Sequence, residues 1–279
     1  MGGLRPGSRV IGMDEPLRGV GRTALAVARV RAAEHRRADR ILTDPFAEAF
    51  AAAGPPAAPV RGGPARDLMV LQVIVRTRFY DDYLRAATAA GIRQVVLLAA
   101  GLDTRAFRLD WPDGTRLFEV DLPDVLDFKD AALAGAEPRC ERTTVAADLR
   151  DDWARRLRAA GFDPSRRTAW LVEGLLIYLL PGDAAALLGG IGAESVPGGR
   201  LAAEDGAGTA WLLEHARRNP DQFRAGPLWN GGLGEATASW LEEHGWRTER
   251  HALTDVAASY GRPAPEGTRS GFLTAERLS

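Results

Sequence analysis

The sequence has 279 residues but only one cysteine, Cys140, and only one lysine, Lys129. A single cysteine cannot form a disulfide within the chain, and it excludes a structural zinc site built on several thiolates. The histidines are scattered, and no two of them have metal-ligand spacing on a helix, so the sequence predicts no metal site. They are His35, His215, His244 and His251.

Several catalytic motifs are also absent. Val125 stands four residues before Lys129, so the Tyr-x-x-x-Lys pair of short-chain dehydrogenases is missing, and Asp130 after Lys129 excludes a Walker A loop. The chain has no G-x-S-x-G nucleophile elbow, and no G-x-G-x-x-G follows its first predicted strand. An α/β-hydrolase is therefore excluded, and a nicotinamide-dependent oxidoreductase is kept only as an alternative.

The chain has no strong excess of charge and no long apolar run near its start. Its net charge is -1, with a pI of about 6.5, which favours a small ligand over nucleic acid or an anionic membrane. The arginine-rich segments 29–40 and 155–167 alternate with apolar or acidic residues, as solvated helix faces do. The first residues are broken by Gly and Pro and predict neither a signal peptide nor a membrane span. We expect a cytoplasmic protein.

Three segments differ in texture. Residues 1–20 are rich in Gly and Pro and predict a flexible arm, whereas 21–93 show helical patterns and predict a cap. We expect the remainder, 94–279, to form the core, with a lid insertion at about 206–234. The expected cap helices cover residues 23–37, 44–53 and 67–90.

The core alternates short apolar runs with helical stretches. Residues 95–100 form an apolar run that ends in a turn at Gly101, as a strand buried on both faces does. Strands alternating with helices predict a mostly parallel sheet in an α/β fold. Further strands are expected at 116–120, 143–147, 168–172, 200–203, 246–252 and 272–275, the last two joined by a Pro/Gly-rich connection. Helices are expected at 125–134, 151–160, 183–195 and 235–244.

The ends of the predicted strands carry polar residues, and a doubly wound sheet binds its ligand at that edge. The first strand runs into the small residues Ala99-Ala100-Gly101, which allow close approach of a ligand, although any strand-turn-helix junction needs a glycine. Asp121 follows about twenty residues later, at the spacing of a carboxylate that accepts hydrogen bonds from ribose hydroxyls. A helix cap is the alternative role for Asp121.

The next two strand ends extend the pattern. Asp148 can bond an adenine amino group while Leu149 contacts the ring, although Asp148 can also cap the following helix. Glu173 ends a buried strand beside Gly174 and needs a partner, and a cationic amino group of a ligand would serve.

Five motifs in order resemble the leucine carboxyl methyltransferase family. They are Asp81-Asp82 after Arg76-Thr77-Arg78, then VVLLAAGLDTRAFRL, FEVDLP, AADLR and WLVEGLLIYL. The similarity covers about residues 20–275 and is closest to the bacterial branch, which includes polyketide O-methyltransferases. It implies a Rossmann-like class I methyltransferase with a mostly parallel seven-stranded sheet and an N-terminal helical cap. The implied cofactor is S-adenosyl-L-methionine.

The resemblance also implies roles for individual residues. Arg76 would pair with the carboxylate of the cofactor, and Glu173 would lie near its methionine amino group. Gly101 would belong to the cofactor loop, where Ala99 replaces a glycine that the family often has. If that position needs a positive φ or a very close approach, the alanine weakens cofactor binding, whereas in a β conformation its methyl group is harmless. Asp121 would hold the ribose, and Asp148 and Leu149 the adenine.

The acceptor is less defined by the sequence. The implied reaction is O-methylation of a carboxylate or hydroxyl on a small hydrophobic metabolite, with polyketides as one candidate class. No general base stands in the motifs at the strand ends, which favours a carboxylate because it is already ionised at neutral pH. An acidic phenol is the second choice, since an ordinary phenol would need a base. Tyr178 and His215 are the candidates near the acceptor, and a cofactor-binding module without catalysis is a further alternative. The sequence does not indicate an oligomeric state.

Overall fold

The computed structural model describes residues 20–56, 62–220, 223 and 225–278. The predicted arm, 1–20, lies outside this range except for its last residue. Within the described residues, seven strands form one sheet in the order β3-β2-β1-β4-β5-β7-β6. The strands are β1 (Gln94–Leu98), β2 (Arg116–Asp121), β3 (Glu141–Ala146), β4 (Thr168–Val172), β5 (Arg200–Glu204), β6 (Trp246–Ala252) and β7 (Gly271–Arg277).

The first five strands are parallel, whereas β7 is antiparallel to both β5 and β6. This confirms the predicted mostly parallel, seven-stranded α/β fold. The longer helices are α1 (Val20–His35), α3 (Pro64–Ala89), α5 (Pro123–Ala132), α7 (Pro181–Ala193) and α8 (Thr209–Arg218). The shorter ones are α2 (Ala47–Ala53), α4 (Arg105–Arg108), α6 (Trp153–Ala159), α9 (Thr237–Glu243) and α10 (Leu253–Ser259).

The central strands are buried at every position because helices cover both faces of the sheet. Alternate side chains of β1 enter two different hydrophobic clusters. Val95 and Leu97 pack with side chains of α1 to α5 and α10. Val96 and Leu98 pack on the other face with side chains of α6, α7 and α9. The period of two along the strand therefore divides the core between the two faces.

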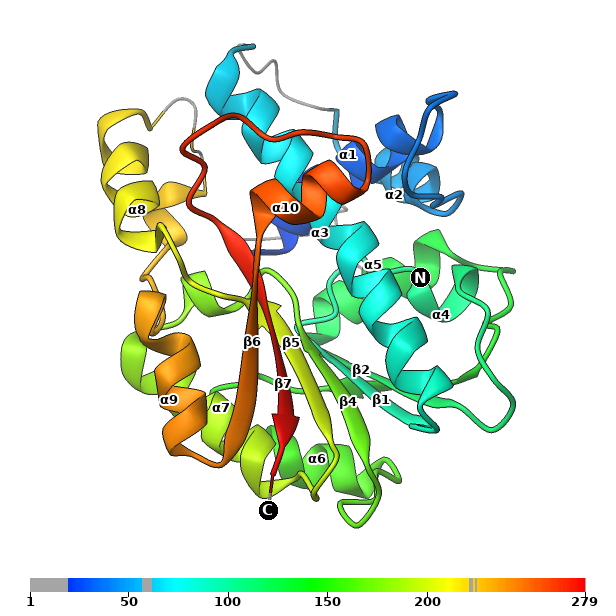
Figure 1. Cartoon of the computed structure of the whole chain (residues 1–279). Coiled ribbons are helices and arrows are strands. Elements are labelled where there is room, and N and C mark those ends of the chain that lie inside the picture. The colour runs from blue at the N-terminus through cyan, green and yellow to red at the C-terminus, as the bar shows by residue number, and fades with distance from the viewer. Residues whose placement is uncertain (1–19, 57–61, 221–222, 224, 279) are drawn as a thin grey trace, which may run out of the picture.

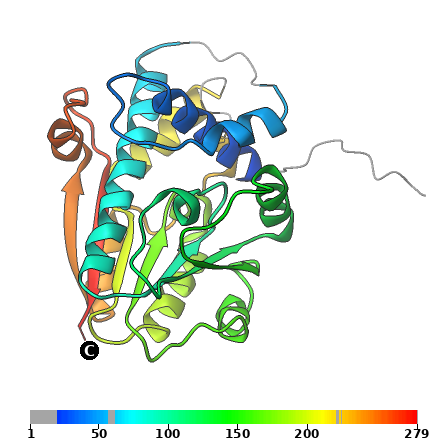
Figure 2. The same ribbon diagram turned by 90° about the vertical axis from the view of Figure 1, so that its right-hand side faces the viewer.

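The helical cap lies over the carboxyl ends of the parallel strands. Helices α1 and α2, the upper part of α3 and α8 occupy this end of the molecule in both ribbon views (Figures 1 and 2). Helix α3 is 26 residues long, and it extends from the cap down one face of the sheet. A cleft between cap and sheet is consequently placed where a doubly wound fold binds its ligand.

Two helices were not predicted. Helix α10 forms the first part of the connection between β6 and β7, and it buries Leu253 and Ala257 on one side. The glycines and prolines of this connection begin only at Gly261, after the helix has ended. Helix α8 occupies the first half of the predicted lid. Where the structure describes the second half, it forms the single turns η2 (Gly226–Leu228) and η3 (Gly234–Ala236).

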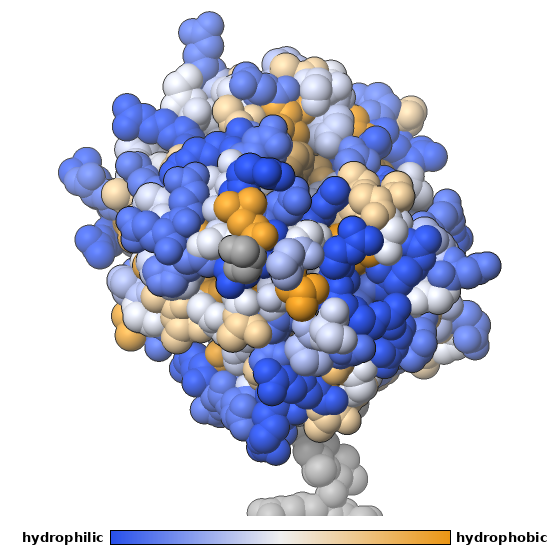
Figure 3. Space-filling model, turned by 60° about the horizontal axis from the view of Figure 1, so that its bottom comes forward, coloured by the Kyte–Doolittle hydropathy of each residue, from blue (hydrophilic) through white to orange (hydrophobic). Residues whose placement is uncertain are grey.

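The surface opposite the cap is mostly hydrophilic, with hydrophobic side chains in small, separate groups (Figure 3). Among the described residues, no helix combines the length and the apolar character that crossing a membrane requires.

Candidate active site

The turn after β1 and the acid after β2, which the sequence marked separately, are bonded to each other. The backbone N–H of Gly101 donates to Oδ2 of Asp121 at 2.6 Å, and the N–H of Leu122 donates to Oδ1 at 2.7 Å. Burial raises the pKa of Asp121 above its ordinary value, although these two N–H groups oppose that effect. Both residues line the same cavity. The carboxylate of Asp121 therefore also stabilises the turn at residues 99–101, called here the cofactor-type turn.

Ala99 adopts the conformation that the sequence left in question. Its φ is +51°, and it is the only non-glycine residue of the described chain with a positive φ. Gly101 has a φ of +50°. An alanine at the first position is therefore strained in this turn, because its methyl group disfavours the left-handed region.

Asp148 and Leu149 lie after β3 and line the same cavity. The carboxylate of Asp148 accepts from the backbone N–H of Arg150 at 2.9 Å and forms an ion pair with its guanidinium at 2.6 Å. These bonds hold the pKa of Asp148 below its ordinary value. The residue at the start of α6 is Asp152, so the alternative role of Asp148 as a cap of that helix is not observed.

Glu173 finds its partners within the protein. Its Oε1 accepts from Nε of Arg76 at 3.0 Å, and its Oε2 accepts from Nη1 of Arg105 at 2.8 Å. Burial alone raises the pKa of Glu173, but the two guanidinium groups bring it below its ordinary value. The partner that this buried acid requires is therefore supplied by two arginines of the protein, and its place beside a ligand amino group stays a prediction. The two arginines lie 97 and 68 residues away along the chain, beyond the reach of local sequence patterns.

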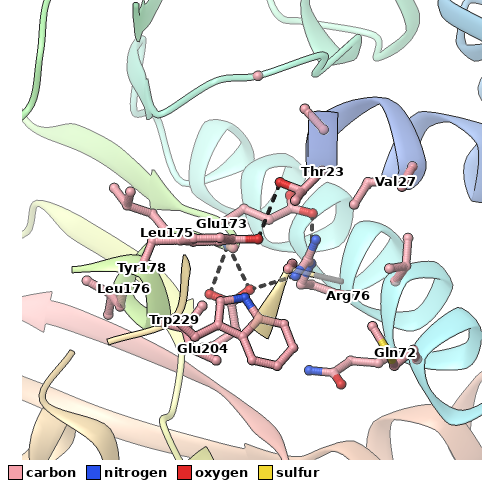
Figure 4. A pocket seen from close by; sticks show the side chains of 18 of the residues that line it. Thr23, Val27, Gln72, Arg76, Glu173, Leu175, Leu176, Tyr178, Glu204 and Trp229 are labelled. Atoms are coloured by element: carbon pink, nitrogen blue, oxygen red, sulfur yellow. Dashed lines mark hydrogen bonds and ion pairs between the residues drawn. The ribbon is translucent and has the colours of Figure 1, made fainter. Parts of the chain in front are cut away.

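Arg76 also binds a carboxylate that the sequence analysis missed. Its Nη1 donates to Oε1 of Glu204 at 3.0 Å, and the backbone N–H of Gly174 donates to the same carboxylate at 2.8 Å and 3.0 Å. Figure 4 shows Arg76 joined to both Glu173 and Glu204. The fifth strand was expected to end at Ala203. The run Leu-Ala-Ala-Glu-Asp has the same strand-then-acid signal as the other strand ends, and it marks both Glu204 and Asp205.

A buried ionic network continues behind these residues. Arg105 is only 1% exposed and binds Asp81 through Nε at 2.7 Å, as well as Asp103 and Glu173 through Nη1. Arg108 binds the other oxygen of Asp81 at 2.5 Å. Arg105 is the first residue of α4, directly after the turn at Gly101. Through Asp81 and Glu173, the network connects this part of the chain to α3 and to the end of β4.

The cavity bounded by the described residues has a volume of about 2560 Å³. Typical sites for one small ligand have roughly 300 to 1,000 Å³, so this cavity has room for two molecules. Every residue that the sequence proposed for the site lines it. They are Arg76, Ala99, Gly101, Asp121, Asp148, Leu149 and Glu173, together with Tyr178 and His215.

The two acceptor candidates come from different elements, Tyr178 from the turn after β4 and His215 from helix α8 of the lid. The hydroxyl of Tyr178 is 3.3 Å from Oγ1 of Thr23 in the cap. The ring of His215 stacks on the ring of Trp211 at 4.7 Å between centroids, and it meets the ring of Phe223 edge-on at 5.5 Å. Neither candidate is hydrogen-bonded to a carboxylate among the described residues, as an oriented general base would be.

Backbone hydrogen bonds hold the lid against the turn after β4. The N–H groups of Asn230 and Gly231 donate to the carbonyl of Ile177 at 2.8 and 2.9 Å, and the side chain of Asn230 donates to the carbonyl of Tyr178 at 2.7 Å. The backbone of Gly232 lies so close to the turn after β4 that an added Cβ would be 2.5 Å from the carbonyl oxygen of Leu176. These contacts therefore hold residues 230–232 of the lid against the turn after β4.

Comparisons with known proteins agree with this arrangement. Residues 24–192 match the sequence model of the family described as leucine carboxyl methyltransferase. A relative from Parafrankia sp. (strain EAN1pec) is 51% identical and covers 93% of this chain and 87% of its own. One from Frankia alni is 53% identical and covers 93% and 95%. Both are named as S-adenosyl-L-methionine-dependent methyltransferases.

Two solved structures share the fold at low sequence identity. A DUF574 family protein from Streptomyces avermitilis has a TM-score of 0.58 and 18% identity, covering 90% of this chain and 96% of its own. Magnesium protoporphyrin IX methyltransferase from Synechocystis, solved with bound S-adenosylhomocysteine, has a TM-score of 0.50 and 14% identity, covering 82% and 93%. At this identity the likeness concerns the fold alone.

The sheet topology and the similarity to these relatives show that the protein is a Rossmann-like, S-adenosylmethionine-dependent methyltransferase. Within that class, the chain belongs to the leucine carboxyl methyltransferase family.

Proposed function

We propose that this methyltransferase transfers the methyl group of S-adenosylmethionine to an oxygen of a small hydrophobic metabolite, with polyketides as a candidate class. The observation that carries the proposal is the convergence on one large cavity of all the residues suggested by the strand ends and the family motifs. A cytoplasmic location and a role in secondary metabolism stay predictions.

The residues present fit the cofactor. Asp121 would accept from the ribose hydroxyls, and Asp148 and Leu149 would hold the adenine. Arg76 and Glu173 would face the carboxylate and the amino group of the methionine part, since a guanidinium and a carboxylate complement that zwitterion. Ala99 and Gly101 would let the backbone approach the ligand.

The bound cofactor supplies an activated methyl group on a sulfonium. The work of the protein is therefore to align an acceptor oxygen in line with the carbon–sulfur bond and to exclude water. The cap and the lid are suited to that task, because they enclose the cavity from the side opposite the sheet.

Calorimetry tests the cofactor assignment. We expect S-adenosylmethionine and S-adenosylhomocysteine to bind, and NAD not to bind. Tight binding of NAD without a response to S-adenosylhomocysteine would overturn the proposal in favour of an oxidoreductase. Binding without methyl transfer to any acceptor in a broad panel would favour a binding module.

A further inference from the structure

Glu204 is a carboxylate in the cavity wall with incomplete charge compensation. Its side chain is 20% exposed, and the guanidinium of Arg76 that it binds is shared with Glu173. The buried network as a whole contains three guanidinium groups and four carboxylates, which leaves one negative charge in excess. The cations are Arg76, Arg105 and Arg108, and the anions are Asp81, Asp103, Glu173 and Glu204.

The neighbouring groups that the structure describes do not supply the missing positive charge. Arg31 acts on Asp103 but is itself paired with Asp44 at 2.9 Å. Lys129 acts on Asp103 but is itself paired with Glu119 at 2.8 Å. Asp205, the residue directly after β5, is a further acid and brings no cation with it, since it has no ion pair among the described residues. Burial raises its pKa. The buried hydroxyl of Tyr80 lies near Glu204 and is neutral, since burial raises its pKa far above the ordinary value.

Burial also raises the pKa of Glu204, and the nearby Glu173 adds to that effect while Arg76 opposes it. A carboxylate in such surroundings accepts a proton more readily than an exposed one. The same excess of negative charge disfavours a second anion in this part of the cavity.

The wall of the same cavity also contains an unpaired hydrogen-bond donor. Nε1 of Trp229 is buried and has no partner among the described residues, although an indole N–H is a donor that needs an acceptor. Figure 4 shows Trp229 in the pocket with Glu204 and Arg76. Trp229 belongs to the lid, and the lid backbone lies close to the chain just beyond Glu204. The approach is so close that a Cβ added to Gly206 would collide with the carbonyl oxygen of Gly234.

A pocket that offers both an N–H donor and a carboxylate acceptor fits a ligand hydroxyl better than it fits a ligand carboxylate. A hydroxyl can accept from the indole of Trp229 and donate to Glu204, whereas an ionised carboxylic acid can only accept and brings a second negative charge. The lining is also aromatic. Rings of Trp211, His215, Phe223 and Trp229 follow one another with centroids 4.7, 5.5 and 6.1 Å apart.

We infer that the acceptor is a neutral hydroxyl on a planar aromatic ring, and that Glu204 is the catalytic residue that takes its proton. The inference rests on the proposed methyl transfer and names the group that receives the methyl. As the oxygen forms its bond to the methyl carbon, the O–H proton passes to the carboxylate of Glu204. The carbon–sulfur bond breaks with its electron pair remaining on sulfur, which becomes a neutral thioether. The proton then leaves Glu204 to solvent with the product.

A matched pair of probes tests the selectivity by calorimetry on the complex with S-adenosylhomocysteine. 2-Naphthol and 2-naphthoate share one ring system and differ in the group at the acceptor position. We expect the naphthol to bind the wild-type protein at least about tenfold more tightly, because the naphthoate places a second anion near Glu204. In Glu204→Gln we expect the naphthoate to gain at least about threefold in affinity while the naphthol changes less.

The control variant Glu249→Gln removes an equal charge from the exposed side of β6, outside the cavity, and should leave both affinities unchanged. Equal or tighter binding of the naphthoate to the wild type, or no effect of Glu204→Gln on the ratio, would overturn the inference. So would a complex that binds neither probe. Binding of S-adenosylhomocysteine in these same titrations would show that the proposed cofactor site stands even where the acceptor inference fails.

Product chemistry gives a second, independent test. With cofactor labelled in the methyl group, the labelled product of the wild-type enzyme should keep its label in mild alkali, as an aryl ether does. Release of labelled methanol would identify an ester and reject the hydroxyl acceptor. The rate of Glu204→Gln should fall at least about a hundredfold, and raising the pH to ionise the phenol should recover part of the loss. A loss that is the same at every pH would reject Glu204 as the proton acceptor.

Discussion

At the scale of single residues, Ala99 shows a conflict between sequence and backbone. It holds a φ of +51° at the start of the cofactor-type turn, where a glycine would have no steric penalty. We expect Ala99→Gly to stabilise the protein by about 1 kcal/mol in urea unfolding, because relief of the left-handed strain outweighs the added freedom of the unfolded chain.

The neighbouring Ala100→Gly is the matched control for that change. Ala100 does not have a positive φ and is 8% exposed, so the same substitution there should destabilise the protein. Destabilisation by both substitutions would indicate that the turn does not have the strained conformation.

Asp121 combines two tasks in one carboxylate. Both of its oxygens accept backbone N–H groups, and it is the proposed ribose ligand. We expect Asp121→Ala to weaken the binding of S-adenosylhomocysteine by about 1 to 3 kcal/mol in calorimetry, since charge-assisted hydrogen bonds are lost and the turn loses its brace.

Asp151→Ala, which removes an exposed acid near the start of α6, is the control for Asp121 and should have little effect on affinity. Thermal unfolding of both variants separates a local loss of affinity from a loss of folding. Equal affinities in two folded variants would mean that the ribose lies elsewhere.

At the scale of elements, the lid depends on a close approach of backbone to backbone. Gly232 has a φ of +56°, and a Cβ there would be 2.5 Å from the carbonyl oxygen of Leu176. We expect Gly232→Ala to displace the lid from the turn after β4 and to raise the KM for the acceptor at least about threefold, because the acceptor is no longer aligned. Affinity for S-adenosylhomocysteine should change less.

Gly114 offers the matched control for the lid. Its φ is +73°, but an added Cβ would meet nothing within 4 Å. Gly114→Ala should therefore show only the conformational penalty, about 1 kcal/mol of stability, with an unchanged KM. A similar KM in both variants would show that the close contact under the lid has no role in the acceptor site.

The elements were largely predictable because their signals are local. The four buried parallel strands β1, β2, β4 and β5 and the turn at Gly101 follow from apolar runs and small residues, and the family motifs placed the acids on neighbouring strands. Helix α10 was missed because the glycines and prolines that follow it dominated the pattern of the whole connection.

The ionic partners could not be predicted from local patterns. Arg76 and Arg105 meet Glu173 over separations of 97 and 68 residues, and in a chain whose basic residues are almost all arginine neither stands out. Glu204 was predictable, unlike these arginine partners, because it is an acid at the end of an apolar run. It was missed because the predicted strand ended at Ala203, one residue before the end of β5. The sequence motifs thus assigned seven residues to the proposed cofactor side of the cavity, whereas only Tyr178 and His215 were named for the acceptor side.

At the scale of the whole molecule, Arg105 links the cap side to the sheet through three carboxylates. It is 1% exposed and binds Asp81, Asp103 and Glu173. Removing one partner of a buried ionic network leaves charges without compensation. We therefore expect Arg105→Met to lower the free energy of unfolding at pH 7 by about 3 to 5 kcal/mol, measured in urea.

The pH dependence of that loss identifies its cause. In the wild type, Arg105 with Lys129 brings the pKa of Asp103 to about 2, against the effect of burial. A lowered pKa contributes stability above the unfolded value of about 4, and this contribution disappears as the pH falls toward 2. In Arg105→Met, burial should instead raise the pKa of Asp103, so the penalty is greatest at high pH and is relieved as the pH falls through the raised value.

The difference in stability between the wild type and Arg105→Met should accordingly be smaller at pH 5 than at pH 7. Arg155→Met is the control, because that arginine is 72% exposed and pairs with the exposed Asp152, so its removal should change stability little at either pH. If Arg105→Met lost the same stability at both values, its effect would come from lost packing, and the carboxylates around it would have to be neutral already. A decreasing difference means instead that the charge of Arg105 holds the turn after Gly101, α3 and the end of β4 together as one unit.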